Sequence, residues 1–330
     1  MRRAGRRFRP PAPAGFLLYN AAVPAQPPTD DVLTIVIPAY NERVSLESNL
    51  PGWLQACDDN RWRLIIVDDG SDDGTLPALQ ARASHPRLLA LRHRTNRGYG
   101  NALKSGLAHV RTPYSVTMDA DGQHRVEDVL RLREAIQTQD ADMVIGARVV
   151  NDTSGAYRRA GKRLIRLIAR LLFRPGIRDL NSGFKLYRTP IAQRLLPWCP
   201  GSMAFSDVMT LMHLNLDLHV VEIPVETRPR LGGRSTISTM TAVETVLEII
   251  NLLMWFKPLK IFLPGAALLV LLGFGWGLPF LIAERGLSVF ALLLVLSGLL
   301  TGMVGLLAEQ LATLRRIDLS DLSARPIASE

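Results

Sequence analysis

The sequence predicts an α/β fold with a parallel sheet, followed by two C-terminal transmembrane helices. Between residue 31 and about residue 235, apolar runs rich in β-branched residues alternate with stretches of helical periodicity, which is typical of a parallel sheet. Further along, residues 261–283 and 286–308 contain no charged side chain. Because ~20 apolar residues let a helix cross the hydrocarbon core, each run predicts one membrane span.

The chain divides into five predicted regions. Residues 1–30 are basic and proline-rich without an apolar run of signal-peptide length, which predicts a disordered arm. The α/β domain is expected over residues 31–236, and a juxtamembrane amphipathic helix over residues 237–257. Residues 258–310 hold the two spans, and residues 311–330 form a tail.

Charges beside the spans predict their orientation. Lys257 and Lys260 precede the first span and Arg315 and Arg316 follow the second, whereas the Glu284-Arg285 connection is neutral. Positively charged flanks stay on the cytoplasmic side of a membrane. We therefore expect a multi-pass protein of the inner (cytoplasmic) membrane, with both termini and the α/β domain in the cytoplasm.

The charge and cysteine content of the chain indicate which kinds of partner it binds. Lysine and arginine total 39 against 30 acidic residues, which gives a formal net charge of +9. In a chain with two spans, this excess suits an anionic membrane surface and anionic substrates better than nucleic acid. Cys57 and Cys199 form no framework spacing, which suits a reducing compartment and argues against zinc. A homo-oligomer stays an open alternative.

The expected elements alternate along the α/β domain. Strands are expected over residues 32–37, 63–67, 88–92, 114–118 and 142–145, and helices over residues 44–57, 74–83, 99–110 and 126–138. Polar clusters follow three of the strands, at residues 38–42, 68–71 and 119–123. Because ligands bind at the carboxyl ends of parallel strands, these clusters predict the position of the site.

Asp119 and Asp121 are the candidate metal ligands. Carboxylate oxygens suit Mg²⁺ or Mn²⁺, and magnesium typically takes one or two carboxylates together with phosphate oxygens. A D-x-D triplet also occurs by chance in loops. Here the triplet follows an apolar strand and continues as Gly122-Gln123-His124, which favours a metal that acts as a Lewis acid on a diphosphate leaving group.

Asp68 and Asp69 end another expected strand and are followed by Gly70 and Ser71. Such a cluster is typical of a turn and a helix cap. One of the two aspartates has a second interpretation, in which its carboxylate accepts a hydrogen bond from the N–H of a uracil or guanine ring.

In their order and spacing, these motifs resemble those of the family 2 glycosyltransferases, in the polyprenyl-phosphate branch typified by dolichyl-phosphate mannose synthase. The resemblance covers residues 32–240. It rests on the segments at residues 38–42, 67–75, 96–98, 119–124, 146–148 and 179–185. It implies a GT-A type nucleotide-binding sheet with interfacial helices.

The resemblance also implies roles for single residues. Pro38, Tyr40 and Glu42 would contact the nucleoside, and Asp69 or Asp68 the base. The metal and the diphosphate would be bound by the segment that contains Asp119, Ala120, Asp121 and Gln123. Within it, the metal ligands would be Asp119, Asp121 and Gln123. Arg148 would reach a phosphate, and His124 would order the loop.

A late family motif, Arg-x-x-Gly-x-Ser-Lys, is matched only in part. Arg230, Gly233 and Ser235 fit it, so Arg230 is expected at the pyrophosphate. Thr236 stands where the family usually has lysine, so the loop lacks the cation that the family motif has at this position.

The acceptor side is predicted from basic residues. Residues 157–173 have cations on one helical face and apolar residues on another, which favours contact with lipid over simple packing on the sheet. Lys185, Arg178 and Arg188 are candidates for the acceptor phosphate, and Lys185 is the best placed of them by resemblance. Asp179 is expected to act as a base or to orient a cation. Asp121, Asp179, Lys185 and Arg148 are therefore the expected catalytic residues.

The implied reaction is inverting transfer of a hexose from UDP-glucose or GDP-mannose to undecaprenyl or dolichyl phosphate at the inner leaflet. A tethered transferase with a non-lipid acceptor and a non-catalytic nucleotide-sugar-binding protein are the alternatives. A processive polysaccharide synthase is disfavoured, because such enzymes need more spans and a Gln-x-x-Arg-Trp motif that the sequence lacks.

Overall fold

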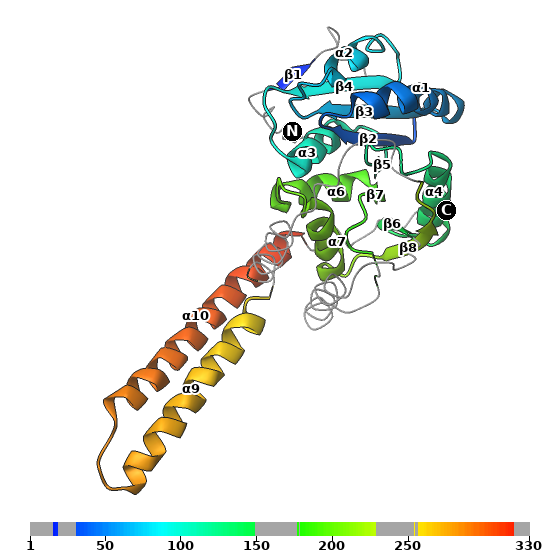
Figure 1. The fold of residues 1–330 in the computed structure, drawn as a ribbon. Helices are drawn as coiled ribbons and strands as arrows, with labels where there is room; N and C mark the ends of the chain where they lie inside the picture. Colours follow the sequence, from blue (N-terminus) through cyan, green and yellow to red (C-terminus); the bar gives the residue numbers. More distant parts are fainter. Residues whose placement is uncertain are drawn as a thin grey trace, which may run out of the picture.

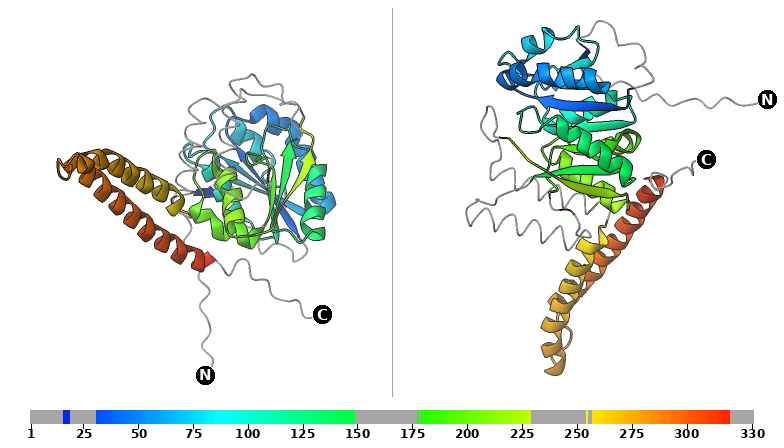
Figure 2. Two further views of the ribbon diagram at one scale, coloured as in Figure 1. Left: turned by 90° about the horizontal axis from the view of Figure 1, so that it is seen from below. Right: turned by 90° about the vertical axis from the view of Figure 1, so that its right-hand side faces the viewer.

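A computed structural model describes residues 16–18, 31–148, 177, 179–228, 254 and 257–319. In this part of the chain, an eight-stranded sheet carries helices on both faces, and a helical hairpin projects away from it (Figures 1 and 2). The predicted combination of an α/β domain with a C-terminal pair of long helices is therefore confirmed.

The strands lie in the order β1-β4-β3-β2-β5-β7-β6-β8. They are β1 Phe16–Leu18, β2 Leu33–Ala39, β3 Trp62–Asp68, β4 Leu88–His93, β5 Tyr114–Thr117, β6 Met143–Arg148, β7 Lys185–Arg188 and β8 Val220–Val225. All five predicted strands are present, and β2 is parallel to both β3 and β5.

The expectation of a parallel sheet is wrong at two places. Strand β7 runs antiparallel between β5 and β6, and β1 runs antiparallel to β4. Within residues 1–30, which are predicted as a disordered arm, the structure describes residues 16–18, and these pair with β4 at the sheet edge. The sheet is therefore mixed.

Two groups of helices cover the two faces of the sheet. Helices α1 (Arg43–Asn60), α2 (Thr75–Gln80) and α4 (Glu127–Thr138) bury apolar residues in one core cluster, and α3 (Tyr99–His109), α6 (Thr189–Leu195) and α7 (Phe205–Asn215) in the other. A short 3₁₀ helix, Leu196–Trp198, follows α6. Side chains alternate along β2, since Ile35 faces the first cluster and Val36 the second. All four predicted helices are confirmed.

Helices α9 (Leu259–Ile282) and α10 (Val289–Leu319) form the hairpin, and both are long and apolar enough to cross a membrane. Small residues bring them together: a Cβ atom at Gly273 or Gly298 would lie 2.7 Å from a valine methyl of the facing helix. Helix α10 continues past the predicted span end at residue 310. Ile261, in the first turn of α9, packs against the core cluster of α3, α6 and α7.

Three predicted features lie outside the described residues. They are the basic helix at 157–173, the tail from residue 320, and most of the juxtamembrane helix at 237–257.

Gly106 tests how closely α3 packs on the sheet. A Cβ atom there would overlap Val36 Cγ1 and lie 3.2 Å from Val67 Cγ2. We expect Gly106→Ala to cost about 1–3 kcal/mol and to lower the thermal midpoint by a few degrees. Gly52→Ala in α1 is the matched control, because nothing lies within 4 Å of its Cβ position and alanine favours helix. An equal midpoint for both variants would contradict the packing.

Candidate active site

The polar clusters predicted from the sequence lie at one edge of the sheet. Parallel pairing of β2 with β3 and β5 places the carboxyl ends of these strands together. The loops that follow them hold residues 40–42, 69–74 and 118–126. This edge is where an open α/β sheet binds ligands.

The loops after β2 and β3 are fastened to one another by side chains. Asn41 adopts a left-handed φ of 56°. Its N–H donates to Ser71 Oγ over 3.0 Å, and its Oδ1 accepts from the N–H of Asp72 over 3.1 Å. The Glu42 N–H donates to Thr75 Oγ1 over 3.0 Å. Each motif therefore satisfies backbone groups of the other.

The expected nucleoside residues differ in accessibility. Pro38 is buried in β2 opposite Val67. Tyr40 is 47% exposed, and Glu42 is half-buried. Of the three, Tyr40 presents the side chain most open to a ligand.

Asp69 holds a loop together. Its carboxylate accepts from the N–H of Arg97 over 2.9 Å and of Gly98 over 2.8 Å, and it pairs with His93 Nδ1. Ser105 Oγ lies 2.9 Å from His93 Nε2. With its oxygens used in this way, Asp69 is poorly placed to bind a base.

Asp68 is fully buried at the end of β3. Its Oδ1 accepts from the Ser71 N–H over 3.0 Å, and its Oδ2 lies 3.4 Å from Arg92 Nε. That contact has no hydrogen-bond geometry. Asp68 therefore retains more acceptor capacity for a base than Asp69 has.

The acidic loop is anchored from α1 and within itself. Ser45 Oγ donates to the Ala120 carbonyl, so buried Ala120 fixes the loop through its backbone. Asp121, 5% exposed, accepts from the Gln123 N–H over 3.1 Å. Gly122 takes a positive φ of 74°, which turns the chain there.

Asp119 is held by two residues outside the loop. Tyr99 Oη donates to Asp119 Oδ1 over 2.9 Å. A Cβ atom on Gly183 would lie 2.8 Å from each Asp119 oxygen and from Tyr99 Oη. Only glycine therefore lets the backbone at 183 come this close.

The electrostatics fit a divalent cation beside Asp119 and Asp121. Burial raises the pKa of Asp119, and the charge of Asp121 raises it further, while His124 and Tyr99 lower it. Among the described residues, no three His, Cys, Asp or Glu side chains are grouped for a metal. Two carboxylates suffice for Mg²⁺ when a substrate phosphate completes its shell.

His124 stacks on Phe184 with ring centroids 4.7 Å apart. Its Nδ1 is buried and has no hydrogen-bond partner among the described residues. Burial lowers the pKa of His124 against the charges of Asp119 and Asp121. The stacking supports the expected role in ordering the loop.

Arg148 and Asp179 form a two-pronged ion pair at the rim of the site. Arg148 Nε and Nη2 donate to the Asp179 carboxylate over 2.9 and 3.0 Å, and the Arg148 N–H adds a bond of 3.1 Å. Burial alone would raise the pKa of Asp179, but the hydrogen bonds from Arg148 lower it. A carboxylate held ionised in this way suits orienting Arg148 better than accepting a proton.

Lys185 is not placed as expected for an acceptor-phosphate ligand. The side chain is fully buried, and Nζ donates to the carbonyls of Leu180 and Ser206 over 2.7 and 2.6 Å and to Thr210 Oγ1 over 2.8 Å. All three donors of the ammonium are therefore occupied. The reason is β7, which carries Lys185 into the interior between β5 and β6.

Arg188 is also misplaced for that role. It ends β7 opposite Tyr114, the first residue of β5, far from the carboxyl ends of the parallel strands. Its Nε donates to the Ala141 carbonyl over 2.9 Å and its Nη2 to Asp140 Oδ1 over 2.6 Å. Arg178, Arg230 and Thr236 lie outside the described residues.

The segment before the late motif runs beside the acidic loop. The Arg228 N–H donates to the Gln123 carbonyl over 2.9 Å, and Gln123 Nε2 donates back to the Arg228 carbonyl over 3.4 Å. Gln123 is therefore tied to the chain that leads toward Arg230.

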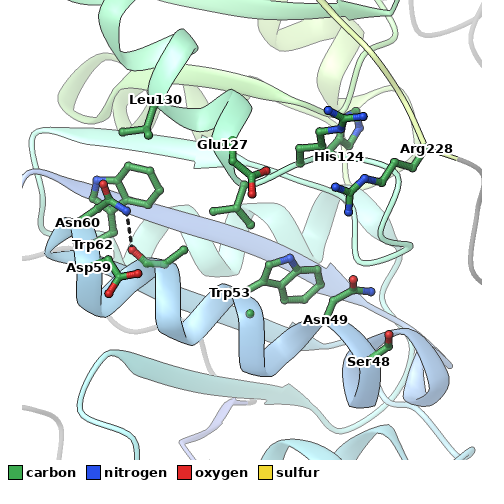
Figure 3. A pocket seen from close by; sticks show the side chains of 14 residues that line it. Ser48, Asn49, Trp53, Asp59, Asn60, Trp62, His124, Glu127, Leu130 and Arg228 are labelled. Carbon is green, nitrogen blue, oxygen red and sulfur yellow. Dashed lines mark hydrogen bonds between the residues drawn. The ribbon is translucent and has the colours of Figure 1, made fainter.

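A hollow of about 350 Å³ lies between α1 and α4 (Figure 3). Trp53 and Asn49 line it from α1, and Glu127 and Leu130 line it from α4. His124 is shared with the acidic loop, but Asp119 and Asp121 are not part of its lining. The hollow therefore lies beside the carboxylate site and does not contain it.

Sequence reasoning missed four residues of the site region. Tyr99 follows a recognised motif directly, and Gly183 lies within another, but neither position reveals its contact with Asp119. Ser45 and Asp207 gave no signal. Asp207 is buried in the first turn of α7, and its Oδ1 accepts no hydrogen bond from the described part of the chain. Burial raises its pKa to about 6, with the charge of Lys185 opposing.

Comparison with known sequences gives two family matches. The glycosyl transferase family 2 profile matches residues 34–196, and the GtrB C-terminal hairpin profile matches residues 257–314. The undecaprenyl-phosphate 4-deoxy-4-formamido-L-arabinose transferase of Pseudomonas paraeruginosa is 30% identical over 311 residues, or 90% of this chain and 88% of that protein. The enzyme of the same name from Sodalis glossinidius is 29% identical over 310 residues, or 90% and 92%.

Comparison with solved structures supports the fold. Glucosyl-3-phosphoglycerate synthase from Mycobacterium tuberculosis, in complex with Mn²⁺, UDP-glucose and phosphoglyceric acid, matches with a TM-score of 0.52. The identity is 18%, over 68% of this chain and 80% of that chain. The predicted GT-A type sheet is thereby confirmed.

Lys185→Met tests whether the ammonium is a buried structural group. Burial lowers the pKa of Lys185 to about 8, below the value of about 10.4 for an exposed lysine. Between these pH values the unfolded chain binds more protons than the folded chain, so this group adds stability as the pH rises. We expect thermal unfolding to show the wild type gaining on the order of 3 kcal/mol over the variant from pH 8 to 10. Parallel pH profiles would contradict the burial.

Proposed function

Because the chain belongs to the polyprenyl-phosphate branch of the family 2 glycosyltransferases, we propose that it transfers one sugar from a nucleotide diphosphate-sugar to undecaprenyl or dolichyl phosphate at the inner leaflet. The observation that carries the proposal is the placement of Asp119 and Asp121. They lie beside the loops proposed to bind the nucleoside, in a chain that ends in two helices able to cross a membrane.

The donor is proposed as UDP-glucose or GDP-mannose. Tyr40 is the exposed residue of the first loop, and Asp68 is the better placed of the two aspartates to accept from the base. The relatives named for 4-deoxy-4-formamido-L-arabinose add a modified arabinose as a third donor sugar.

The acceptor phosphate is proposed to enter on the side of Arg148. The Arg148 side chain is 40% exposed although it is paired with Asp179. Its guanidinium has donors in a planar fork that suits phosphate oxygens. Since Lys185 and Arg188 are engaged elsewhere, Arg148 is the remaining described residue among the cations expected to contact a phosphate.

The proposed chemistry is a single in-line displacement. An oxygen of the carrier phosphate forms a bond to the anomeric carbon while the bond from that carbon to the diphosphate oxygen breaks, which inverts the configuration. A phosphate monoester is already largely ionised at neutral pH, its second pKa being about 6, so a strong base is not required. This agrees with an Asp179 that is held as an anion by Arg148.

A bound Mg²⁺ or Mn²⁺ would supply Lewis-acid stabilisation of the charge that develops on the diphosphate. Asp119 and Asp121 would hold it, with Gln123 beside them. The protein's own residues then position the two anionic groups and exclude other geometries.

The direct test is transfer of label into lipid. Nanodiscs with the full chain are incubated with undecaprenyl phosphate and a panel of labelled nucleotide sugars, and radioactivity is counted after organic extraction. We expect one donor to label the organic phase. Label that appears only in water-soluble products would point to a non-lipid acceptor, and binding without transfer would point to a non-catalytic protein; either result would refute the proposal.

Asp121→Ala and EDTA test the metal. Both should reduce transfer on the order of 100-fold or more, because the charge on the leaving diphosphate loses its stabilisation. Added Mg²⁺ or Mn²⁺ should restore the EDTA-treated wild type and leave the variant inactive. Glu134→Ala is the control, since it removes a carboxylate from the exposed side of α4. Activity that survives both treatments would exclude the metal.

A further inference from the structure

Tyr99 contributes the one hydroxyl that the described residues aim at the acidic loop's first carboxylate. It begins α3, its ring packs against the core cluster of α3, α6 and α7, and Oη donates to Asp119 Oδ1 over 2.9 Å. Asp119 Oδ2 receives no hydrogen bond from the described part of the chain. The bond thus divides the carboxylate into an engaged oxygen and an open one.

The backbone on both sides of Tyr99 is fixed. The Gly98 N–H donates to Asp69 Oδ2 over 2.8 Å, and the Asn101 N–H donates to the Gly201 carbonyl over 3.2 Å. Gly98 has a φ of 95°, and a Cβ atom there would lie 2.8 Å from the Gly201 oxygen. The backbone hydrogen bonds on both sides of Tyr99 therefore hold its phenol ring in position beside Asp119.

The backbone at Gly183 packs directly against the Asp119 carboxylate and the Tyr99 hydroxyl. A Cβ atom at that position would crowd Asp119 Oδ1, Asp119 Oδ2 and Tyr99 Oη, each at 2.8 Å. The backbone and the hydroxyl together limit the rotamers of the carboxylate.

The carboxylate of Asp69 shows what a purely structural arrangement looks like in the same molecule. Both of its oxygens accept from backbone N–H groups, and His93 adds a further contact. Asp119, by contrast, accepts a single hydrogen bond from the described residues, the one from Tyr99 Oη. Asp119 is half-buried, and its Oδ2 is not enclosed by the described residues, so this oxygen is accessible to a ligand.

We propose that Tyr99 is a positioning residue for the divalent cation: its hydroxyl engages Asp119 Oδ1 so that Oδ2 is the oxygen that faces the ion. The inference rests on the proposed function for the identity of the ion. Groups that hydrogen-bond to a metal-binding side chain orient it, and their loss typically weakens metal binding about 10- to 100-fold.

The experiment measures binding of Mn²⁺ alone to the full chain in nanodiscs, by electron paramagnetic resonance of the free ion. Tyr99→Phe keeps the ring and removes only the hydroxyl, and we expect it to weaken Mn²⁺ binding about 10- to 100-fold. Tyr187→Phe is the matched control. It is also buried, and its Oη lies 3.5 Å from Thr117 Oγ1 instead of bonding to Asp119, so Mn²⁺ binding should equal that of the wild type.

Gly183→Ala gives a second variant, because its methyl group would crowd both the Asp119 carboxylate and Tyr99 Oη, and it should also weaken Mn²⁺ binding. In transfer assays, the Mn²⁺ concentration for half-maximal rate should rise by the same factor in Tyr99→Phe. A purely structural role would lower the thermal midpoint and leave this concentration unchanged.

The outcomes separate the two proposals. Wild-type affinity in Tyr99→Phe, with binding lost in Asp121→Ala, would overturn the role of Tyr99 alone. A wild type that binds Mn²⁺ with the expected dependence on Tyr99 but transfers no sugar would overturn the proposed function and keep the positioning role. A wild type that binds no Mn²⁺ would overturn both the metal and Tyr99's part in holding it.

Discussion

Strand β7 runs antiparallel between β5 and β6, and the geometry of the site depends on this pairing. Its first residue, Lys185, lies opposite Thr117 at the end of β5, so the residues just before β7 are carried over the carboxyl edge where the acidic loop begins. Gly183 then closes on Asp119, and Asp179 reaches Arg148. In a purely parallel sheet the same residues would arrive at the opposite edge.

The sequence was informative about where the site lies and less so about which side chains are accessible. Alternating apolar runs located the five strands and four helices, and the strand-end clusters located the edge. Strand β7 was not predicted, because its four residues begin and end with a cation, which no strand pattern favours. Lys185 was therefore expected to bind the acceptor phosphate. Its depth follows from pairing with β5 and β6, which are distant in sequence.

Some motif residues are placed to bind a ligand, whereas others hold the loops of the site in place, and the sequence does not distinguish the two groups. Asp69 was expected at the base, yet its carboxylate organises the loop before α3. A motif shows that a carboxylate is needed at a position, but it does not show whether that carboxylate binds a ligand or accepts hydrogen bonds from backbone N–H groups. Tyr99 shows the converse, since its contact with Asp119 joins the end of β5 to the start of α3. Such contacts become visible only when the fold brings the segments together.

The buried ammonium of Lys185 has a consequence for local motion. Its bonds end on the loop at Leu180 and on α7 at Ser206 and Thr210. If the loop opened alone, a cation in the interior would lose one of its three partners without gaining water, at a cost of several kcal/mol. The loop and the first turns of α7 are thus coupled into one cooperative unit of local unfolding. Their amide hydrogens would exchange together, on the slow timescale of the core.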